Sequence, residues 1–158
     1  MKKRYPIAGV VLLLACVLSA GCSTPKTTTT SVSEGDVTSL VAENSAFALD
    51  LYRQLAHEDG NLFFSPFSIS SALAMTYAGA REETARQMAE VMHFSLAPEK
   101  LHPAFSELTA MFNAPGKPYQ LSVANALWGQ VDYEFLADFV EIANKYYGAG
   151  FKEVDYAR

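Results

Sequence analysis

The sequence predicts an α+β fold, in which helices and strands share one domain. Apolar residues recur at helical spacing in 40–57, where Leu40, Phe47 and Leu51 fall on one face. Residues 119–129 instead alternate between two faces, as a strand does. Half of the 158 residues are hydrophobic, which is enough to build a core and argues against disorder.

Residues 1–21 are predicted to be a signal peptide. Lys2, Lys3 and Arg4 form a basic start, and an apolar stretch follows at 7–20 that is too short to span a membrane comfortably. We therefore expect an exported protein, held at the cell surface or elsewhere outside the cytoplasm, or alternatively secreted.

Small residues precede a cysteine at the end of this signal. The sequence Leu-Ser-Ala-Gly-Cys at 18–22 resembles a bacterial-type lipobox, although Ser19 stands where leucine is more usual. The run at 13–16, ending in Cys16, is a weaker second candidate. We expect Cys22 to become the first mature residue and to carry lipid, which would hold the protein on a membrane. Plain signal cleavage is the alternative.

The chain that remains after signal-peptide removal is acidic and is not expected to form a disulfide. Removal of 1–21 takes three of the 12 Lys and Arg residues and none of the 17 Asp and Glu residues, which leaves a formal charge of -8. Nucleic acid and heparin are therefore not expected as partners. If Cys22 is lipidated and Cys16 is removed, the domain has no disulfide.

The domain is predicted to begin at residue 40. Residues 22–39 contain the lipidated cysteine and a Thr- and Ser-rich stretch that is typical of a tether. Residues 40–158 then carry the helix and strand patterns. We find no internal repeat.

A serine-rich apolar stretch at 61–80 follows the first predicted helix. Its serines and proline argue against a membrane span. Residues 61–64 read as a short buried strand, Ser65 as a helix cap and Pro66 as the first helical residue. The helix that follows is apolar or small nearly all round and should be central and buried, ending near Gly79.

Further elements follow the same patterns. Thr84 and Gln87 have capping-box spacing at the start of a short amphipathic helix, and the Glu82-Glu83 pair suits a first helical turn. Pro98 opens another helix, in which Pro103 comes late for a first turn. Beyond the strand at 119–129, a helix over 135–147 and a strand over 151–156 are predicted.

No constellation for catalysis is present. His57, His93 and His102 have no metal-binding spacing, and no serine lies in a nucleophile-elbow motif. Gly148-Ala149-Gly150 lacks the third glycine and the helix of a dinucleotide loop. We therefore predict that the protein is not an enzyme and that it needs no metal or cofactor.

Several ordered motifs resemble those of the serpin family. The strongest is Asn61-Leu62-Phe63-Phe64-Ser65-Pro66-Phe67-Ser68-Ile69, which continues to Tyr77-Ala78-Gly79-Ala80-Arg81. Further matches in the family's order are Asn44 with Phe47-Ala48, Leu101-His102 with Phe105, Ala124-Asn125-Ala126-Leu127-Trp128, and Val154-Asp155-Tyr156. Together they cover residues 40–156.

The resemblance implies helices packed on large antiparallel sheets and an inhibitor of serine or cysteine proteases. In serpins a protease cleaves an exposed reactive loop, which then inserts into the main sheet as a new strand. This chain stops at Arg158, ahead of that loop, so the resemblance makes it the N-terminal portion of a prokaryotic-type lipoprotein serpin. A non-inhibitory binding or scaffold lipoprotein on the same fold is the alternative.

The resemblance also gives the serine-rich stretch a role. It implies a shutter-like region beneath the main sheet, formed by Ser65, Ser68 and Asn125, where small side chains let a strand layer slide over the helix. Hydroxyl groups there can exchange hydrogen-bond partners as the sheet opens. The alternative is that these serines only cap the helix and fill a tight core.

Overall fold

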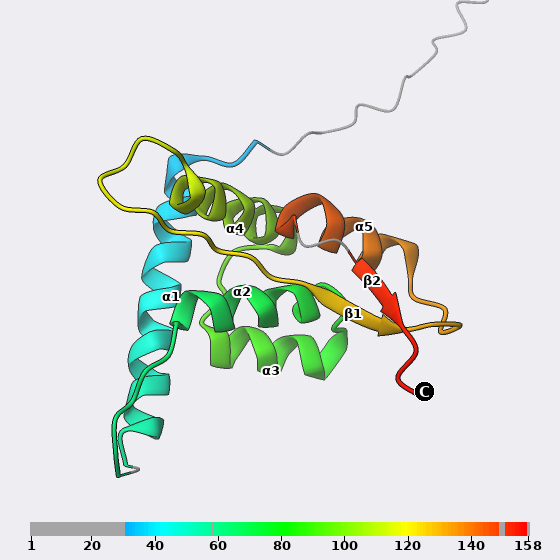
Figure 1. Cartoon of the computed structure of the whole chain (residues 1–158), viewed down its shortest axis with the longest axis horizontal. Helices are drawn as coiled ribbons and strands as arrows, with labels where there is room; N and C mark the ends of the chain where they lie inside the picture. The colour runs from blue at the N-terminus through cyan, green and yellow to red at the C-terminus, as the bar shows by residue number, and fades with distance from the viewer. Residues whose placement is uncertain (1–30, 58, 149–150, 158) are drawn as a thin grey trace, which may run out of the picture.

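The computed structural model describes residues 31–57, 59–148 and 151–157, and in this part of the chain five helices pack beside a two-stranded sheet (Figure 1). Helix α1 (Glu34–Leu55) stands along one side, α2 (Pro66–Tyr77) and α3 (Glu82–Met92) lie side by side, and α4 (Pro98–Asn113) packs against α1 and continues the layer to α5 (Ala137–Tyr147). The predicted signal peptide and Cys22 lie outside the described residues.

Helix α1 (Glu34–Leu55) begins six residues earlier than the sequence pattern suggested. Ser33 caps it: Asp36 N donates to Ser33 Oγ at 3.1 Å, and Ser33 N donates to Asp36 Oδ2 at 2.9 Å. This reciprocal capping box satisfies two backbone donors that would otherwise lack partners. Residues 34–39, assigned to the tether from composition, are therefore helical.

Asp36 also connects the start of α1 to α4. Lys100 Nζ donates to Asp36 Oδ1 at 3.0 Å. The hydrogen bonds from Ser33, backbone first and side chain second, together with Lys100, lower the pKa of Asp36 to about 2. The carboxylate is thus ionised near neutral pH, and its bonds to Ser33 and Lys100 join the start of α1 to α4.

Helix α2 (Pro66–Tyr77) forms where the sequence predicted a helix, but the predicted burial nearly all round is wrong, because Leu73 is 38% exposed. Pro66 occupies its first turn, and Ser65 precedes it as the N-cap. The helix ends two residues before Gly79, with Ala78 as the C-cap. Ser70, Ser71, Ala74 and Met75 are all at most 1% exposed, so one face of α2 is fully covered.

Helices α3 (Glu82–Met92) and α4 (Pro98–Asn113) confirm the predicted elements with two differences. The capping box predicted at Thr84 and Gln87 is wrong, because α3 starts at Glu82 with no side-chain cap. Glu82 and Glu83 lie in its first turn, as expected. Pro103 lies inside α4, where it removes only the backbone bond to Glu99, close to the start of the helix.

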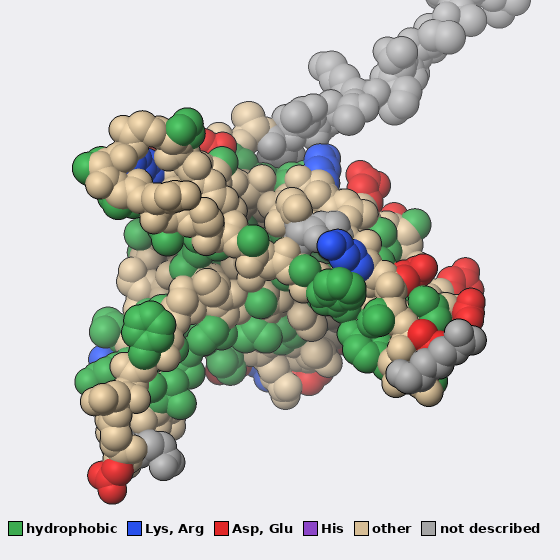
Figure 2. Space-filling model, in the orientation of Figure 1, with side chains coloured by type: hydrophobic (Ala, Val, Ile, Leu, Met, Phe, Trp, Pro, Cys, Tyr) green, Lys and Arg blue, Asp and Glu red, His purple; other side chains and the backbone are tan. Residues whose placement is uncertain are grey.

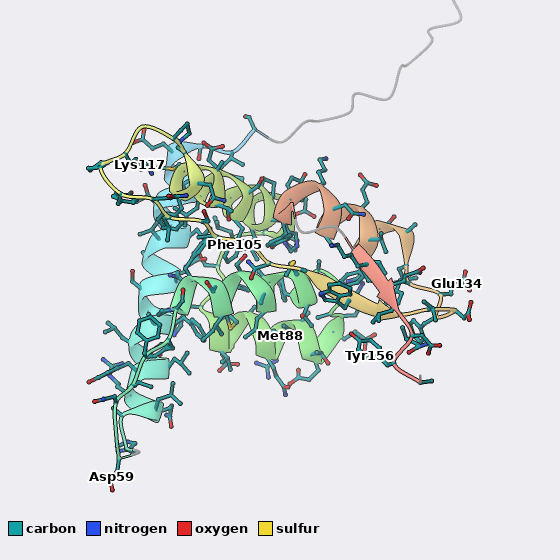
Figure 3. All side chains as sticks on the ribbon, viewed as in Figure 1. Asp59, Met88, Phe105, Lys117, Glu134 and Tyr156 are labelled. Carbon is teal, nitrogen blue, oxygen red and sulfur yellow. The ribbon has the colours of Figure 1, made fainter. Side chains whose placement is uncertain are left out.

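The hydrophobic core lies between α1, α2 and α4. Phe105 of α4 is at its centre and is fully buried (Figure 3). Its ring packs edge-on to Phe94 at a centroid distance of 5.8 Å and lies 6.1 Å from Phe67. Leu40 and Leu101 are also fully buried in this cluster. Full burial of such side chains contributes about 1.5–3 kcal/mol each.

Strands β1 (Leu127–Gln130) and β2 (Phe151–Val154) pair in parallel, with Leu127 opposite Phe151 and Gln130 opposite Val154. Helix α5 (Ala137–Tyr147) is the crossover that a parallel pair requires. The family resemblance implied antiparallel sheets, and this parallel pair is not part of such a sheet. Residues 119–126, predicted as part of a long strand, form no ladder and run across the bundle to β1.

The buried strand predicted at 61–64 is wrong. These residues form no strand, and Phe63 is 99% exposed. A strand needs a neighbour for its backbone groups, and none lies beside this segment within the described residues. Figure 2 shows hydrophobic side chains gathered along this segment and over α2 on the face drawn.

Candidate functional site

The start of α2 holds Ser65 and Ser68 together. Ser68 N donates to Ser65 Oγ at 3.3 Å, and Ser65 Oγ donates to Ser68 Oγ at 2.9 Å. Ser65 is exposed and Ser68 is half-buried. Both predicted shutter serines therefore act in the structure as a local helix cap.

Asn125, the third residue of the predicted shutter-like region, contacts a different serine. Its Nδ2 donates to Ser71 Oγ at 3.0 Å and joins the segment ahead of β1 to the middle of α2. Ser71 is 1% exposed, so this hydrogen bond is shielded from water on the helix side. The sequence suggested Asn125 as a shutter residue and Ser71 as a small side chain on the helix surface, but it did not predict the bond between them.

A second side chain holds the same segment. Asn113, the last residue of α4, donates from Nδ2 to Val123 O at 3.0 Å and accepts from Val123 N at 2.8 Å. The amide thus bonds both backbone groups of Val123 as a neighbouring strand would. Sequence reasoning missed Asn113, although its place just before the predicted break at 114–118 could have suggested an anchoring role.

The segment 119–126 is consequently tied to the helices by few bonds. One side-chain bond reaches α2, and one amide reaches Val123. Serine hydroxyls can donate and accept, so Ser71 can exchange its bond with Asn125 for another partner, whereas the buried Ser70 hydroxyl has no partner within the described residues. This geometry would permit a strand layer to move over α2.

The far end of β1 is held more firmly. A Cβ built on Gly129 would lie 2.4 Å from Phe151 and 2.6 Å from Phe135. These two rings pack edge-on at 4.7 Å, and Phe139 and Tyr133 adjoin them. The rings pack against β1 where Gly129 leaves room, so β1 is anchored to α5 and β2 while the segment before it is not.

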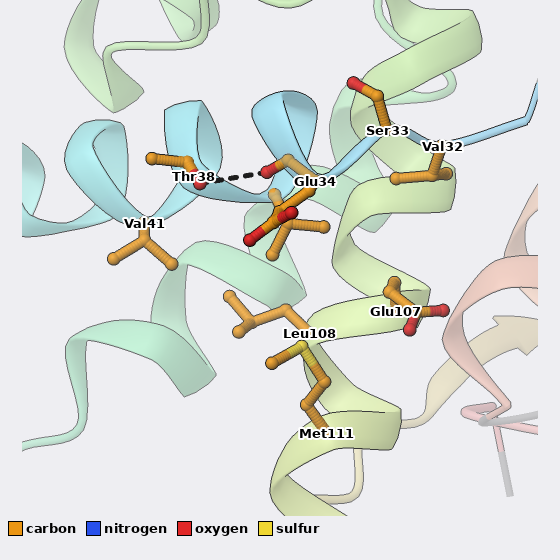
Figure 4. A pocket seen from close by; sticks show the side chains of 9 residues that line it. Val32, Ser33, Glu34, Thr38, Val41, Glu107, Leu108 and Met111 are labelled. Carbon is orange, nitrogen blue, oxygen red and sulfur yellow. Dashed lines mark hydrogen bonds between the residues drawn. The ribbon is translucent and has the colours of Figure 1, made fainter.

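A cavity of about 470 Å³ lies between the start of α1 and the second half of α4 (Figure 4). Val37, Val41, Leu108 and Met111 form an apolar floor, with Glu107 at one side. It shares no residue with Ser65, Ser68 or Asn125. It is therefore a separate feature of the surface.

The described residues contain no group of three side chains that could hold a metal ion. Within the same ranges, no helix combines the length and hydropathy needed to cross a membrane. His57, His93 and His102 are not brought together: His93 Nε2 lies 2.8 Å from Asp50 Oδ2, and His102 bonds Tyr147.

The described residues thus form a helical layer with a βαβ edge, and sequence comparison identifies the family. The family model described as "Serpin (serine protease inhibitor)" matches residues 42–158. The chain belongs to the serpin family. It is 46% identical to the leukocyte elastase inhibitor of Equus caballus over 119 residues, which are 74% of this chain and 31% of that protein.

Other relatives extend the similarity beyond mammals. An uncharacterised serpin-like protein of Thermococcus kodakarensis is 39% identical over 124 residues, 78% of this chain and 29% of that protein. The human leukocyte elastase inhibitor is 43% identical over 119 residues, which are 74% of this chain and 31% of that inhibitor. The chain therefore spans about a third of the length of these curated relatives.

Solved structures give the same fold. Cleaved kallistatin complexed with heparin matches with a TM-score of 0.70 at 31% identity, covering 75% of this chain and 36% of that one. Emu ovalbumin matches with a TM-score of 0.66 at 28% identity, covering 73% and 34%. The predicted fold class, an N-terminal part of a serpin-like α+β fold, is confirmed.

Proposed function

We propose that this chain is the N-terminal part of a serpin whose complete form inhibits a protease outside the cytoplasm by cleavage and insertion of a reactive loop. The observation that carries the proposal is the match of 42–158 to the serpin family, with relatives named as inhibitors of leukocyte elastase. A serine protease is accordingly the first target class to test, and a cysteine protease the second.

The contact between Asn125 and α2 is compatible with an insertion mechanism. Loop insertion requires strands to move over the helix beneath them. In the proposed mechanism the moving layer would pass over the bond from Asn125 to Ser71 and the cap formed by Ser65 and Ser68. The competing role, helix capping and core filling alone, predicts the same static contacts.

Ser68→Leu separates these two roles in the full-length protein. A shutter role predicts altered inhibition or polymerisation, because a larger side chain obstructs the moving layer. Packing alone predicts a loss of stability with an unchanged inhibition stoichiometry. Native gel electrophoresis and the inhibition stoichiometry, measured beside the denaturation midpoint, distinguish the two results.

We further propose that the protein is lipid-anchored through Cys22 and exported. Support comes from the basic, apolar and small-residue pattern of 2–22, which ends ahead of the family match. Metabolic labelling with a radioactive fatty acid tests the anchor. We expect the wild type to incorporate the label and the Cys22→Ala variant to lose it. An unlabelled secreted product would contradict the lipid anchor and indicate signal cleavage without lipidation.

A non-inhibitory carrier is the second candidate function. It is favoured by the likeness to human thyroxine-binding globulin, with a TM-score of 0.68 at 30% identity over 78% of this chain and 34% of that one. Such a protein would bind a small molecule on the same fold and trap no protease.

Protease trapping decides between the candidates. The complete reading frame that contains this sequence is expressed and mixed with a leukocyte-type elastase, a trypsin-like protease and a cysteine protease. A covalent complex that survives SDS is expected with at least one of them. Cleavage of the protein by all three without a complex would contradict inhibition and favour the carrier.

A further inference from the structure

The segment 119–126 is held by its backbone at a single residue. Asn113 donates from Nδ2 to Val123 O at 3.0 Å, and its Oδ1 accepts from Val123 N at 2.8 Å. Within the described residues, no other backbone N–H or C=O group of 119–126 has a hydrogen-bond partner. One side chain therefore supplies the pair of bonds that a neighbouring strand would give.

The end of α4 places this amide beside the segment. Asn113 is the last residue of α4, and the chain reverses directly after it. Gly116 has a φ of +83°, a conformation that glycine adopts without strain. Lys117 Nζ donates back to Met111 O in the last turn of the helix. The reversal is thus tied to the helix end, so Asn113 has a fixed place where Val123 passes it.

Asn113 lies on the same edge of the segment as β2. Val131 N donates to Val154 O of β2 at 3.1 Å, so the N–H of Val131 points to that edge. In an extended chain, backbone groups of residues an even number apart face the same edge, and Val123 is at such a separation from Val131. Pairing with β2 begins only at Leu127. Asn113 therefore continues the edge that β2 covers, at a point that β2 does not reach.

The two bonds of this amide can open without leaving a buried group unpaired. Asn113 is exposed and Val123 is half-buried, and both bonds are accessible to water. Water can therefore replace the amide at both backbone groups when it leaves. The other link of the segment differs, because Asn125 donates to Ser71, which is 1% exposed.

The two links together define one register of the segment. Backbone groups are alike at every residue, so Asn113 alone would also accept Leu121 or Asn125 in place of Val123. The side-chain bond from Asn125 to Ser71 selects Val123. A slip by two residues keeps the same faces but moves the chain by about 6.4–6.8 Å, so it breaks both links.

We propose that Asn113 is a latch for the segment 119–126, and that the opening of this latch sets the rate at which the segment moves over α2. Asn113 is a positioning residue, because it acts through the backbone of Val123 and not on the protease. The kinetic role rests on the loop insertion proposed above, which requires strands to move. The latch itself rests on the described contacts alone.

Hydrogen exchange at the Val123 amide tests the latch. The complete reading frame that contains this sequence is labelled with ¹⁵N-valine, and Val123 is assigned with Val123→Ile. Asn113→Leu removes the donor and the acceptor at similar side-chain size, and the Val123 amide should then exchange faster by on the order of tenfold. Asn113→Asp retains an acceptor for Val123 N and should give an intermediate rate. An exchange rate that is the same in all three proteins would overturn the proposal.

Stopped-flow energy transfer tests the kinetic role. In a covalent complex the protease stays attached to the cleaved loop, so transfer from a labelled protease to a dye on Glu141→Cys of α5 follows insertion. We expect Asn113→Leu to speed this step by up to the factor seen in exchange. Asn144→Leu is the matched control, because Asn144 is an exposed helix amide that accepts from Phe151 N at 2.7 Å, outside the segment. It should leave the rate unchanged.

The outcomes separate this inference from the function on which it rests. An insertion rate unchanged in Asn113→Leu, or raised equally in Asn144→Leu, would overturn the kinetic role while the wild type still traps its protease. A wild type that forms no covalent complex would refute the proposed function and the kinetic role with it. Exchange at Val123 would still decide whether Asn113 holds the segment.

Discussion

Asn125 donates from Nδ2 to Ser71 Oγ at 3.0 Å, across 54 positions of sequence, and so ties the segment ahead of β1 to the central helix. Ser71 is almost fully buried, whereas Asn125 is half-buried. The bond is therefore strong enough to orient the segment. It is also accessible enough to be exchanged when a neighbouring strand moves.

Removal of this bond should have a measurable but modest effect on stability. Asn125→Ala and Ser71→Ala are each expected to lower the free energy of unfolding by about 1 kcal/mol, because a typical internal hydrogen bond contributes that amount. In a double-mutant cycle by urea denaturation, the two changes should be coupled by about 0.5–1.5 kcal/mol. Gln120→Ala, at an exposed position of the same segment, is the control; a coupling near zero would refute the contact.

The cap of α2 provides a second stability test. Ser65→Ala removes the acceptor of Ser68 N and should cost about 1 kcal/mol, whereas Ser65→Asp retains a capping oxygen and should cost less. Ser122→Ala, at an exposed position outside the helices, is the matched control and should be nearly neutral. If the two Ser65 variants unfold at the same urea concentration, the hydroxyl does not act as a cap.

Gly129→Ala should be among the most harmful small substitutions. The added Cβ would lie 2.4 Å from Phe151 and 2.6 Å from Phe135, and both rings are held by their neighbours. Overpacking of this kind costs about 1–3 kcal/mol, and thermal denaturation measures it. Gly35→Ala in α1 is the control, because its Cβ would meet only Ser33 Oγ, at 3.6 Å, and should leave stability unchanged or slightly raised.

The buried imidazole of His102 should make the fold sensitive to mild acid. Burial lowers its pKa from 6.5 to about 4, opposed by Glu99, and Tyr147 Oη occupies Nδ1. Between these two values the unfolded chain binds a proton that the folded chain does not. The contribution of His102 to the free energy of unfolding is therefore fully present above about pH 6.5 and is lost as the pH falls toward 4.

Urea denaturation at a series of pH values tests this prediction. The midpoint should decline between pH 6.5 and pH 4 in the wild type. The decline should be smaller in His102→Gln, and His57→Gln, which alters an exposed residue, should retain the wild-type slope. Equal slopes in all three proteins would show that His102 is not the titrating group.

The helical part of the fold could be predicted from sequence because its signals are local. Helical spacing and Pro98 located α4, and Ser65-Pro66 located the start of α2. The start of α1 was missed because Ser33 and Asp36 lie in a Ser- and Thr-rich stretch, where composition suggested a tether. In a prediction from sequence, a capping signal of two residues counts for less than the composition of the whole stretch around it.

The strands were predicted less well because they depend on distant partners. Alternation at 119–129 was correctly read as extended chain, yet only the part opposite Phe151–Val154 forms a ladder. Phe63 was expected in a buried strand and is exposed, since burial there needs a neighbour that no local pattern supplies. The bonds made by Ser71 and Asn113 were missed for the same reason: each joins residues that the fold, not the sequence spacing, brings together.

The central claim is that this helical layer belongs to an inhibitor that stores strain and releases it by loop insertion. The direct measurement is the thermal denaturation midpoint of the complete protein before and after a protease cleaves its reactive loop. We predict a clear rise on cleavage, because insertion of the loop as an additional strand would relieve the strain stored in the proposed mechanism. An unchanged or lower midpoint would contradict the insertion mechanism.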